Sequence, residues 1–136
     1  MEVLVIDGQG GGLGKAVVSA LRSHFPSFTI NAAGTNSQAT KEMIKAGAMH
    51  GATGENPVAV MSRSADIIIG PIGIVIADSM YGEVTERMAA SVGKARAKRI
   101  LIPVNLCDNI VVGVPDASVS AMIDAVIKAV EAAEQA

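Results

Sequence analysis

A chain of 136 residues, half of them apolar, is long enough to bury one hydrophobic core, so we expect a single domain over residues 1–136. With a net charge of −2, one tyrosine, two phenylalanines and no tryptophan, it lacks the basic surface and aromatic platforms typical of nucleic-acid-binding proteins. The longest apolar stretch, 67–77, is broken by Gly70, Pro71 and Gly73 and is far shorter than the roughly 20 residues that cross a bilayer. We therefore expect neither a nucleic-acid partner nor a membrane span.

Short β-branched runs alternate with helical segments, which predicts an α/β fold: a three-layer α/β/α sandwich with a Rossmann-like, mostly parallel sheet of five or six strands. The expected strands are EVLVID, FTINAA, AMHGATG, ADIIIG and RILIPVN, with NIVVGV as a candidate sixth. Helices are expected over Leu13–His24, from a cap formed by Thr35 and Gln38 to Gly47, from Asn56 onwards, from Ser79 or Glu83 to Lys98, and after a cap at Asp116.

Five glycines lie between Gly8 and Gly14, directly after the first expected strand. Gly8, Gly12 and Gly14 match a G-x-x-x-G-x-G turn, in which glycine permits a tight turn, close approach of a phosphate, and close packing of the next helix. Unpaired N–H groups at the start of that helix would point at the anion. The alternative to phosphate binding is that these glycines only allow the positive φ angles that the turn needs. The expected binding residues are Gly8, Gln9, Gly10, Gly11, Gly12, Leu13, Gly14 and Lys15.

Two related phosphate motifs do not fit this turn. A P-loop needs glycine where Gln9 stands, and Ser or Thr after Lys15, where Ala16 stands. The strict G-x-G-x-x-G pattern fails at Gln9 as well. The spacing therefore favours a variant of the Rossmann turn.

At this turn the chain resembles the short-chain dehydrogenase/reductase superfamily, whose members have a similar glycine spacing. The resemblance implies NAD or NADP on Gly8, Gly12, Leu13 and Gly14. Over its full length the chain is more similar to a small uncharacterised bacterial family, known as a domain of unknown function, with similar GGGLGK, ATGEN, GPIGI and LIPVN stretches. The dehydrogenase Tyr-x-x-x-Lys pair is incomplete here, because Thr85 occupies the lysine position after Tyr81.

The residues after the second expected strand offer a second contact. An NAD binder usually has Asp or Glu there and an NADP binder often has Arg, but this chain has NAAGTNS. Thr35, Asn36 and Ser37 are candidates for holding a 2′-phosphate through hydroxyl, amide and backbone donors. The alternative, which the sequence favours, is that they only cap the second helix.

Three carboxylates, from Glu55, Asp78 and Glu83, are expected near the same edge of the sheet. They are suited to ribose hydroxyls, a substrate amine or phosphate-bound Mg²⁺, although acids near helix starts are also common because of the helix dipole. No pair of residues has a metal-ligand spacing, so no metal site is expected. The roles of these acids and of Cys107 stay open.

Together these patterns predict a domain that binds a nucleotide, with NAD or NADP as the expected cofactor. Two hypotheses stay open: a redox enzyme completed by a partner or second subunit, and a binding or regulatory module that senses a nucleotide or another phosphorylated metabolite. A single cysteine and the absence of a secretion signal at the start predict a cytoplasmic location. We also expect a homo-oligomer, with the apolar residues 72–80 contributing to its interface.

Overall fold

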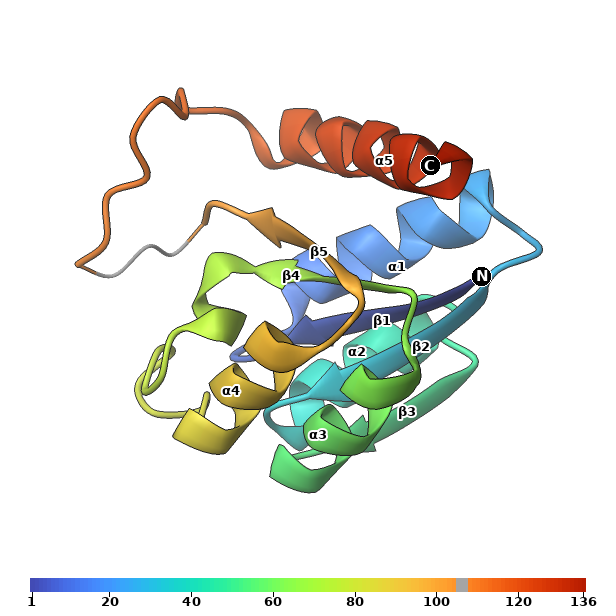
Figure 1. The fold of residues 1–136 in the computed structure, drawn as a ribbon. Coiled ribbons are helices and arrows are strands. Elements are labelled where there is room, and N and C mark those ends of the chain that lie inside the picture. The colour runs from blue at the N-terminus through green and yellow to red at the C-terminus, as the bar shows by residue number, and fades with distance from the viewer. Residues whose placement is uncertain (105–107) are drawn as a thin grey trace.

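The structure is a computed structural model and describes residues 1–104 and 108–136. Its centre is a parallel sheet of five strands, enclosed by helices on both faces (Figure 1). The elements in chain order are β1 Glu2–Asp7, α1 Gly12–His24, β2 Thr29–Gly34, α2 Ser37–Lys45, β3 His50–Thr53, α3 Glu55–Ser64, β4 Ile67–Pro71, the 3-10 helix η1 Ile72–Val75, α4 Glu86–Lys94, β5 Lys98–Ile102 and α5 Val119–Gln135. The predicted fold class is confirmed.

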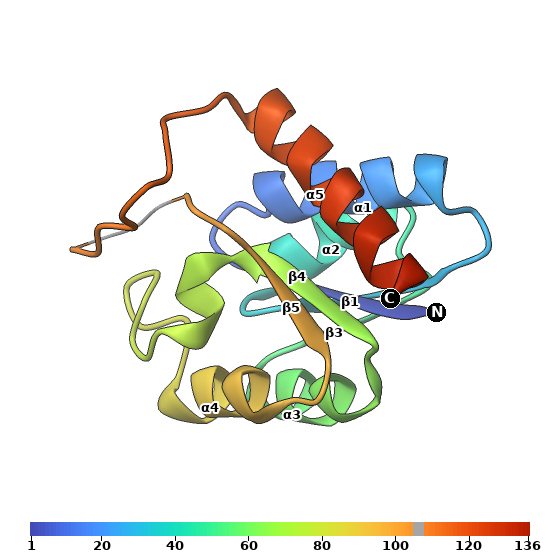
Figure 2. The same ribbon diagram turned by 45° about the horizontal axis from the view of Figure 1, so that its top comes forward.

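Both faces of the central strands are buried, which explains their nearly continuous apolar sequence. Successive side chains of a strand point to opposite faces. Val3 and Val5 of β1 accordingly pack in the core with α1, α2 and α5, whereas Leu4 and Ile6 pack with α3 and α4 on the other face. Figure 2 shows these two helical layers on opposite sides of the sheet.

The helix starts differ from the predicted ones. The side chain of Asn36, not Thr35, caps α2 by accepting a hydrogen bond from the amide of Ala39. The helix α3 begins at Glu55 after Gly54, one residue before the predicted cap at Asn56. Likewise Ser118 caps α5 in place of Asp116. Local spacing leaves neighbouring Asn, Ser, Thr and Asp residues as equal candidates for a cap, so the packing decides among them.

The expected long helix after β4 is wrong over its first part. Residues 76–84 form turns, and α4 begins only at Glu86 after a cap at Thr85. Asp78, Met80 and Tyr81 have positive φ angles of 66°, 56° and 56°, which no α-helix contains. This segment is called the 76–84 loop below.

The candidate sixth strand NIVVGV is also wrong, because residues 109–114 form no strand. The sheet ends at β5, and a further parallel strand requires a crossover of a dozen or more residues. The segment 103–108 that leads from β5 is too short for such a crossover.

The predicted oligomer interface at residues 72–80 is corrected at Ile74 and Met80, whose side chains are buried within the chain. Ile74 and Met80 are 1% and 6% exposed and belong to the core between the sheet and α3 and α4. These two side chains therefore cover the core of their own chain, whereas Ile72, Val75 and Ile76 are partly buried. Among the described residues, no helix is long and apolar enough to span a bilayer.

The strand order β3-β2-β1-β4-β5 determines where a ligand can bind. The chain leaves β1 towards β2 through α1, and it leaves β4 in the opposite direction, towards β5. The turns after β1 and β4 therefore separate and leave a crevice at the carboxyl ends of the strands, which is the usual ligand position in open α/β sheets.

Candidate functional site

Three glycines of the turn between β1 and α1 are required by the protein's own packing. Gly11 has φ of 78°, and a Cβ atom there would lie 2.8 Å from the Cα of Ala39. A Cβ atom on Gly14 would lie 2.7 Å from both the Cβ of Asp7 and the sulfur of Met43. Gly8 is equally confined, by Thr35, Met80 and Glu83. These glycines let the turn lie close to α2 and to the 76–84 loop.

Gly10 and Gly12 differ from the other three. A Cβ atom on either would have no neighbour within 4 Å, neither residue has positive φ, and both are exposed. The fold therefore does not require glycine at these positions. They leave the backbone at the start of α1 uncovered, including the amides of Gly12 and Leu13, which have no hydrogen-bond partner among the described residues.

The third amide of α1 is occupied by a carboxylate of the protein. The amide of Gly14 donates to Oδ2 of Asp7 over 2.6 Å. Asp7 is buried, and this burial raises the pKa of its carboxyl above the ordinary value, against the lowering effect of hydrogen bonds from Gly14 and Gly8. Asp7 thus ties the end of β1 to the start of the helix.

We expect the free energy of unfolding of Asp7→Asn to increase relative to that of the wild type as the pH rises above about 4, the ordinary pKa of an aspartate. Because the pKa of Asp7 is raised in the folded state, the folded protein binds this proton more tightly than the unfolded chain does. Asp7 therefore loses stabilisation as the pH rises above that value, whereas asparagine keeps an oxygen for the Gly14 amide and does not titrate. Urea unfolding of both proteins at several pH values measures the difference, and parallel curves would contradict it.

A second carboxylate, that of Glu83, lies against the same turn. Its Oε1 accepts hydrogen bonds from the amide of Gln9 over 2.9 Å, from Oγ1 of Thr35 over 2.7 Å and from Nδ2 of Asn36 over 2.7 Å. Partial burial alone would raise the pKa of Glu83, but these hydrogen bonds together lower it below the ordinary value. An anionic oxygen of the protein thus occupies a ready-made site between the ends of β1 and β2.

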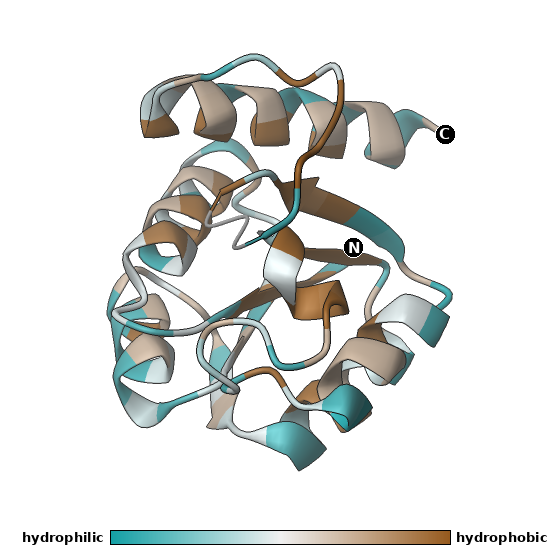
Figure 3. Cartoon of the chain, turned by 90° about the vertical axis from the view of Figure 1, so that its left-hand side faces the viewer, coloured by the Kyte–Doolittle hydropathy of each residue, from teal (hydrophilic) through white to brown (hydrophobic). Residues whose placement is uncertain are grey.

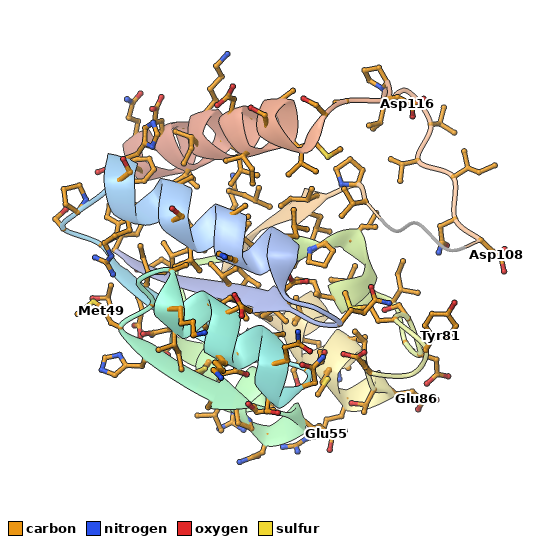
Figure 4. All side chains as sticks on the ribbon, turned by 180° about the vertical axis from the view of Figure 1, so that it is seen from behind. Met49, Glu55, Tyr81, Glu86, Asp108 and Asp116 are labelled. Atoms are coloured by element: carbon orange, nitrogen blue, oxygen red, sulfur yellow. The ribbon has the colours of Figure 1, made fainter. Side chains whose placement is uncertain are left out.

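The 76–84 loop that carries Glu83 has a strained backbone. A residue with a side chain costs roughly 1–2 kcal/mol in the left-handed region, which Asp78, Met80 and Tyr81 all adopt. The side chain of Tyr81 is fully exposed, and Figure 4 shows it on the same side of the molecule as Asp108. Between this loop and Gln9 lies a cavity of about 530 Å³.

The remaining predicted site residues do not all meet at this point. Lys15 lies 3.7 Å from the carboxylate of Glu42, and Ser37 is an exposed residue in the first turn of α2. Asp78 lines the cavity. Glu55 lies apart, where it accepts a hydrogen bond from Thr85 and pairs with Arg87.

The three predicted carboxylates therefore do not form one cluster. No group of three metal-binding side chains occurs among residues 1–104 and 108–136. Cys107 lies outside the described residues.

Sequence reasoning missed two features of the site. One is the role of Asp7, and the other is the contact of Glu83 with Thr35 and Asn36. An aspartate at the end of a buried strand followed by glycines is a usable signal for the first. No sequence signal pairs Glu83 with residues 47 and 48 positions away.

Comparison with known families places the chain. The model of a family described as Domain of unknown function (DUF3842) matches residues 2–135. The chain belongs to this family. None of the curated proteins matches it. Among solved structures, it is similar to a dodecameric FMN-dependent UbiX-like decarboxylase from Escherichia coli O157:H7, with 19% identity and a TM-score of 0.46 over 95% of this chain and 76% of the other. The similarity to the short-chain dehydrogenase/reductase superfamily is not supported by these comparisons.

The prediction of NAD or NADP, and of a redox role that uses it, is wrong. In this DUF3842 member the region between the β1 turn and the end of β2 holds the carboxylate of Glu83. A dinucleotide of the predicted kind would lie across that region, where the carboxylate would repel its phosphates and where Thr35 and Asn36 already have a partner.

Proposed function

We propose that this DUF3842 protein binds a small phosphorylated ligand at the carboxyl edge of its sheet, with the phosphate against the backbone of Gly10, Gly12 and Leu13. The observation that carries this proposal is the contrast among the turn glycines. Packing or positive φ accounts for Gly8, Gly11 and Gly14, but neither accounts for Gly10 and Gly12. A bulky anion resting on bare backbone is a physical reason for leaving these two positions without side chains.

The start of α1 has the electrostatic character that such an anion needs. The amides of Gly12 and Leu13 have no partner among the described residues and lie at the positive end of the helix dipole. Lys15 follows on the same helix and is more than half exposed, so its ammonium group is available near the edge, although Glu42 competes for it. Backbone amides thus supply the main contact, and Lys15 adds a screened charge.

The part of the ligand attached to the phosphate has room beside the turn. The cavity of about 530 Å³ extends from Gln9 along the 76–84 loop and is lined by both apolar and polar side chains, among them Ile76, Ser79 and Tyr81. Pockets of this size hold small metabolites. Glu83 keeps its place beside Thr35 and Asn36, so the ligand carries its negative charge at the α1 end alone.

Isothermal titration calorimetry with inorganic phosphate, ribose 5-phosphate and FMN tests the proposal, because these compounds share a phosphate end and differ in the attached group. Ribose and riboflavin are the matched controls. We expect the phosphorylated members to bind and the controls to bind at least tenfold more weakly. A ligand at 100 times its Kd should also stabilise the fold by about 2.7 kcal/mol. Equal binding with and without the phosphate, or no binding at millimolar concentration, would overturn the proposal.

A further inference from the structure

A groove lies at the β5 edge of the sheet, which is the edge opposite β3, and is lined almost entirely by apolar side chains. It has a volume of about 650 Å³ and lies between β5, the segment 111–117 and the first turns of α5. Ile100, Ile102, Val114, Met122 and Val126 are among its lining residues. Because β5 is the last strand of the sheet, its outer edge also lacks a neighbouring strand in the described structure.

The segment beside this groove exposes large apolar side chains. Ile110 and Val112 are 89% and 91% exposed, whereas Val111 between them lines the groove of its own chain. No backbone hydrogen bond joins residues 110–114 to another described residue. In Figure 1 the segment leading to α5 stands away from the body of the molecule, and Figure 3 colours much of it as hydrophobic.

The sequence of the segment is suited to pairing with a strand edge. Ile110, Val111 and Val112 are β-branched and favour extended backbone, in which alternate side chains point to opposite sides. With Val111 directed at its own groove, Ile110 and Val112 point away from it. Gly113, with φ of 83°, then turns the chain so that Val114 lines the same groove as Val111. Because Val111 and Val114 line the groove of their own chain, Ile110 and Val112 on the other side of the segment cannot enter that groove at the same time, and its remaining space stays open.

We propose that a second copy of this chain covers this surface, so that Ile110 and Val112 of each protomer enter the groove beside β5 of the other. A two-fold axis makes this arrangement self-complementary, since each chain supplies both the apolar segment and the groove. The charges agree with this occupant: β5 begins with the exposed cations Lys98 and Arg99, and exposed Asp108 and Asp116 flank the segment. The partner's segment could run parallel or antiparallel to β5. Because it has an aspartate at each end, either direction brings one of the two aspartates near Lys98 and Arg99.

Multi-angle light scattering at micromolar concentration, on the wild type and on an Ile110→Ser/Val112→Ser double variant, tests this interface. We expect about twice the chain mass for the wild type and the mass of one chain for the variant. Both replaced side chains are almost fully exposed, so the variant should keep its circular dichroism spectrum and its Tm. Met49→Ser, at a side chain that is 56% exposed and lies next to β3, is the matched control and should not change the mass.

A measurement on the wild type alone tests the same interface without relying on a variant. Hydrogen exchange should show the amides of residues 98–102 and 110–114 becoming less protected on dilution, while those of β1 stay unchanged. A wild-type protein with the mass of one chain would overturn the proposal, and so would a folded double variant with the wild-type mass. Neither result bears on phosphate binding at the amides of Gly12 and Leu13, although Asp108 beside the segment also lines the cavity of about 530 Å³.

Discussion

A Gly12→Val variant is expected to fold like the wild type and to lose at least tenfold in affinity for a phosphate monoester. The position is exposed and a Cβ atom there meets nothing within 4 Å, so the protein itself has room for the new side chain. Surface substitutions of this kind usually change stability by less than about 0.5 kcal/mol. The branched side chain would instead stand over the amides of Gly12 and Leu13, where we place the phosphate. Calorimetry and thermal unfolding measure the two effects separately.

Two further valine variants control this experiment. Gly93 is also exposed with open space around its Cβ position, but it lies in α4, so Gly93→Val should leave phosphate binding unchanged. Gly14→Val should destabilise the fold by about 3 kcal/mol, because the added atoms would overlap with Asp7 and Met43. Unchanged affinity in a folded Gly12→Val variant would contradict phosphate binding at this turn.

A Glu83→Gln variant is expected to bind the same phosphate roughly tenfold more tightly, about 1.4 kcal/mol. The lowered pKa of Glu83 means that its carboxylate is charged at neutral pH, and it lies against the Gln9 amide beside the proposed phosphate position. Glutamine keeps an oxygen for the amide of Gln9 and for Thr35 but removes the negative charge that opposes a second anion. Titration of both proteins at low salt gives the change in affinity.

The neighbouring acid Glu86 supplies the control for charge alone. It is exposed in the first turn of α4, so Glu86→Gln removes one negative charge while leaving the Gln9, Thr35 and Asn36 contacts intact. The Glu86→Gln substitution should change phosphate affinity only slightly at low salt and not at all at high ionic strength, because exposed charges are screened. If Glu83→Gln binds phosphate no better than Glu86→Gln, the carboxylate does not lie near the ligand and the proposed phosphate position is wrong.

The contacts of Glu83 also explain why the glycine turn alone wrongly predicts a site for NAD or NADP. The run of glycines is common to turns that hold a pyrophosphate and to turns that hold the protein's own groups. Here Asp7 takes the Gly14 amide and Glu83 takes the Gln9 amide, so only part of the helix start is left for an external anion. Which amides are already occupied depends on groups that approach from elsewhere in the chain.

The amino-acid sequence by itself determined the layers of this fold and the position of the turn. Nearly continuous apolar strands such as EVLVID and ADIIIG are typical of a parallel sheet buried on both faces, and the helical periods between them place the covering layers. These signals are local, because each depends on residues within one or two turns of a helix or along one strand. For the same reason the glycine-rich turn could be placed at the end of β1.

Only the tertiary structure decided what surrounds that turn and which surfaces stay open. The 76–84 loop has an apolar sequence that is compatible with a helix, and its left-handed residues are held by the burial of Met80 and the hydrogen bonds of Glu83. Likewise NIVVGV has the composition of a strand, but residues 109–114 pair with no described strand of the sheet. Contacts between residues far apart in the chain carry no local pattern, so these features emerged only when the elements packed together.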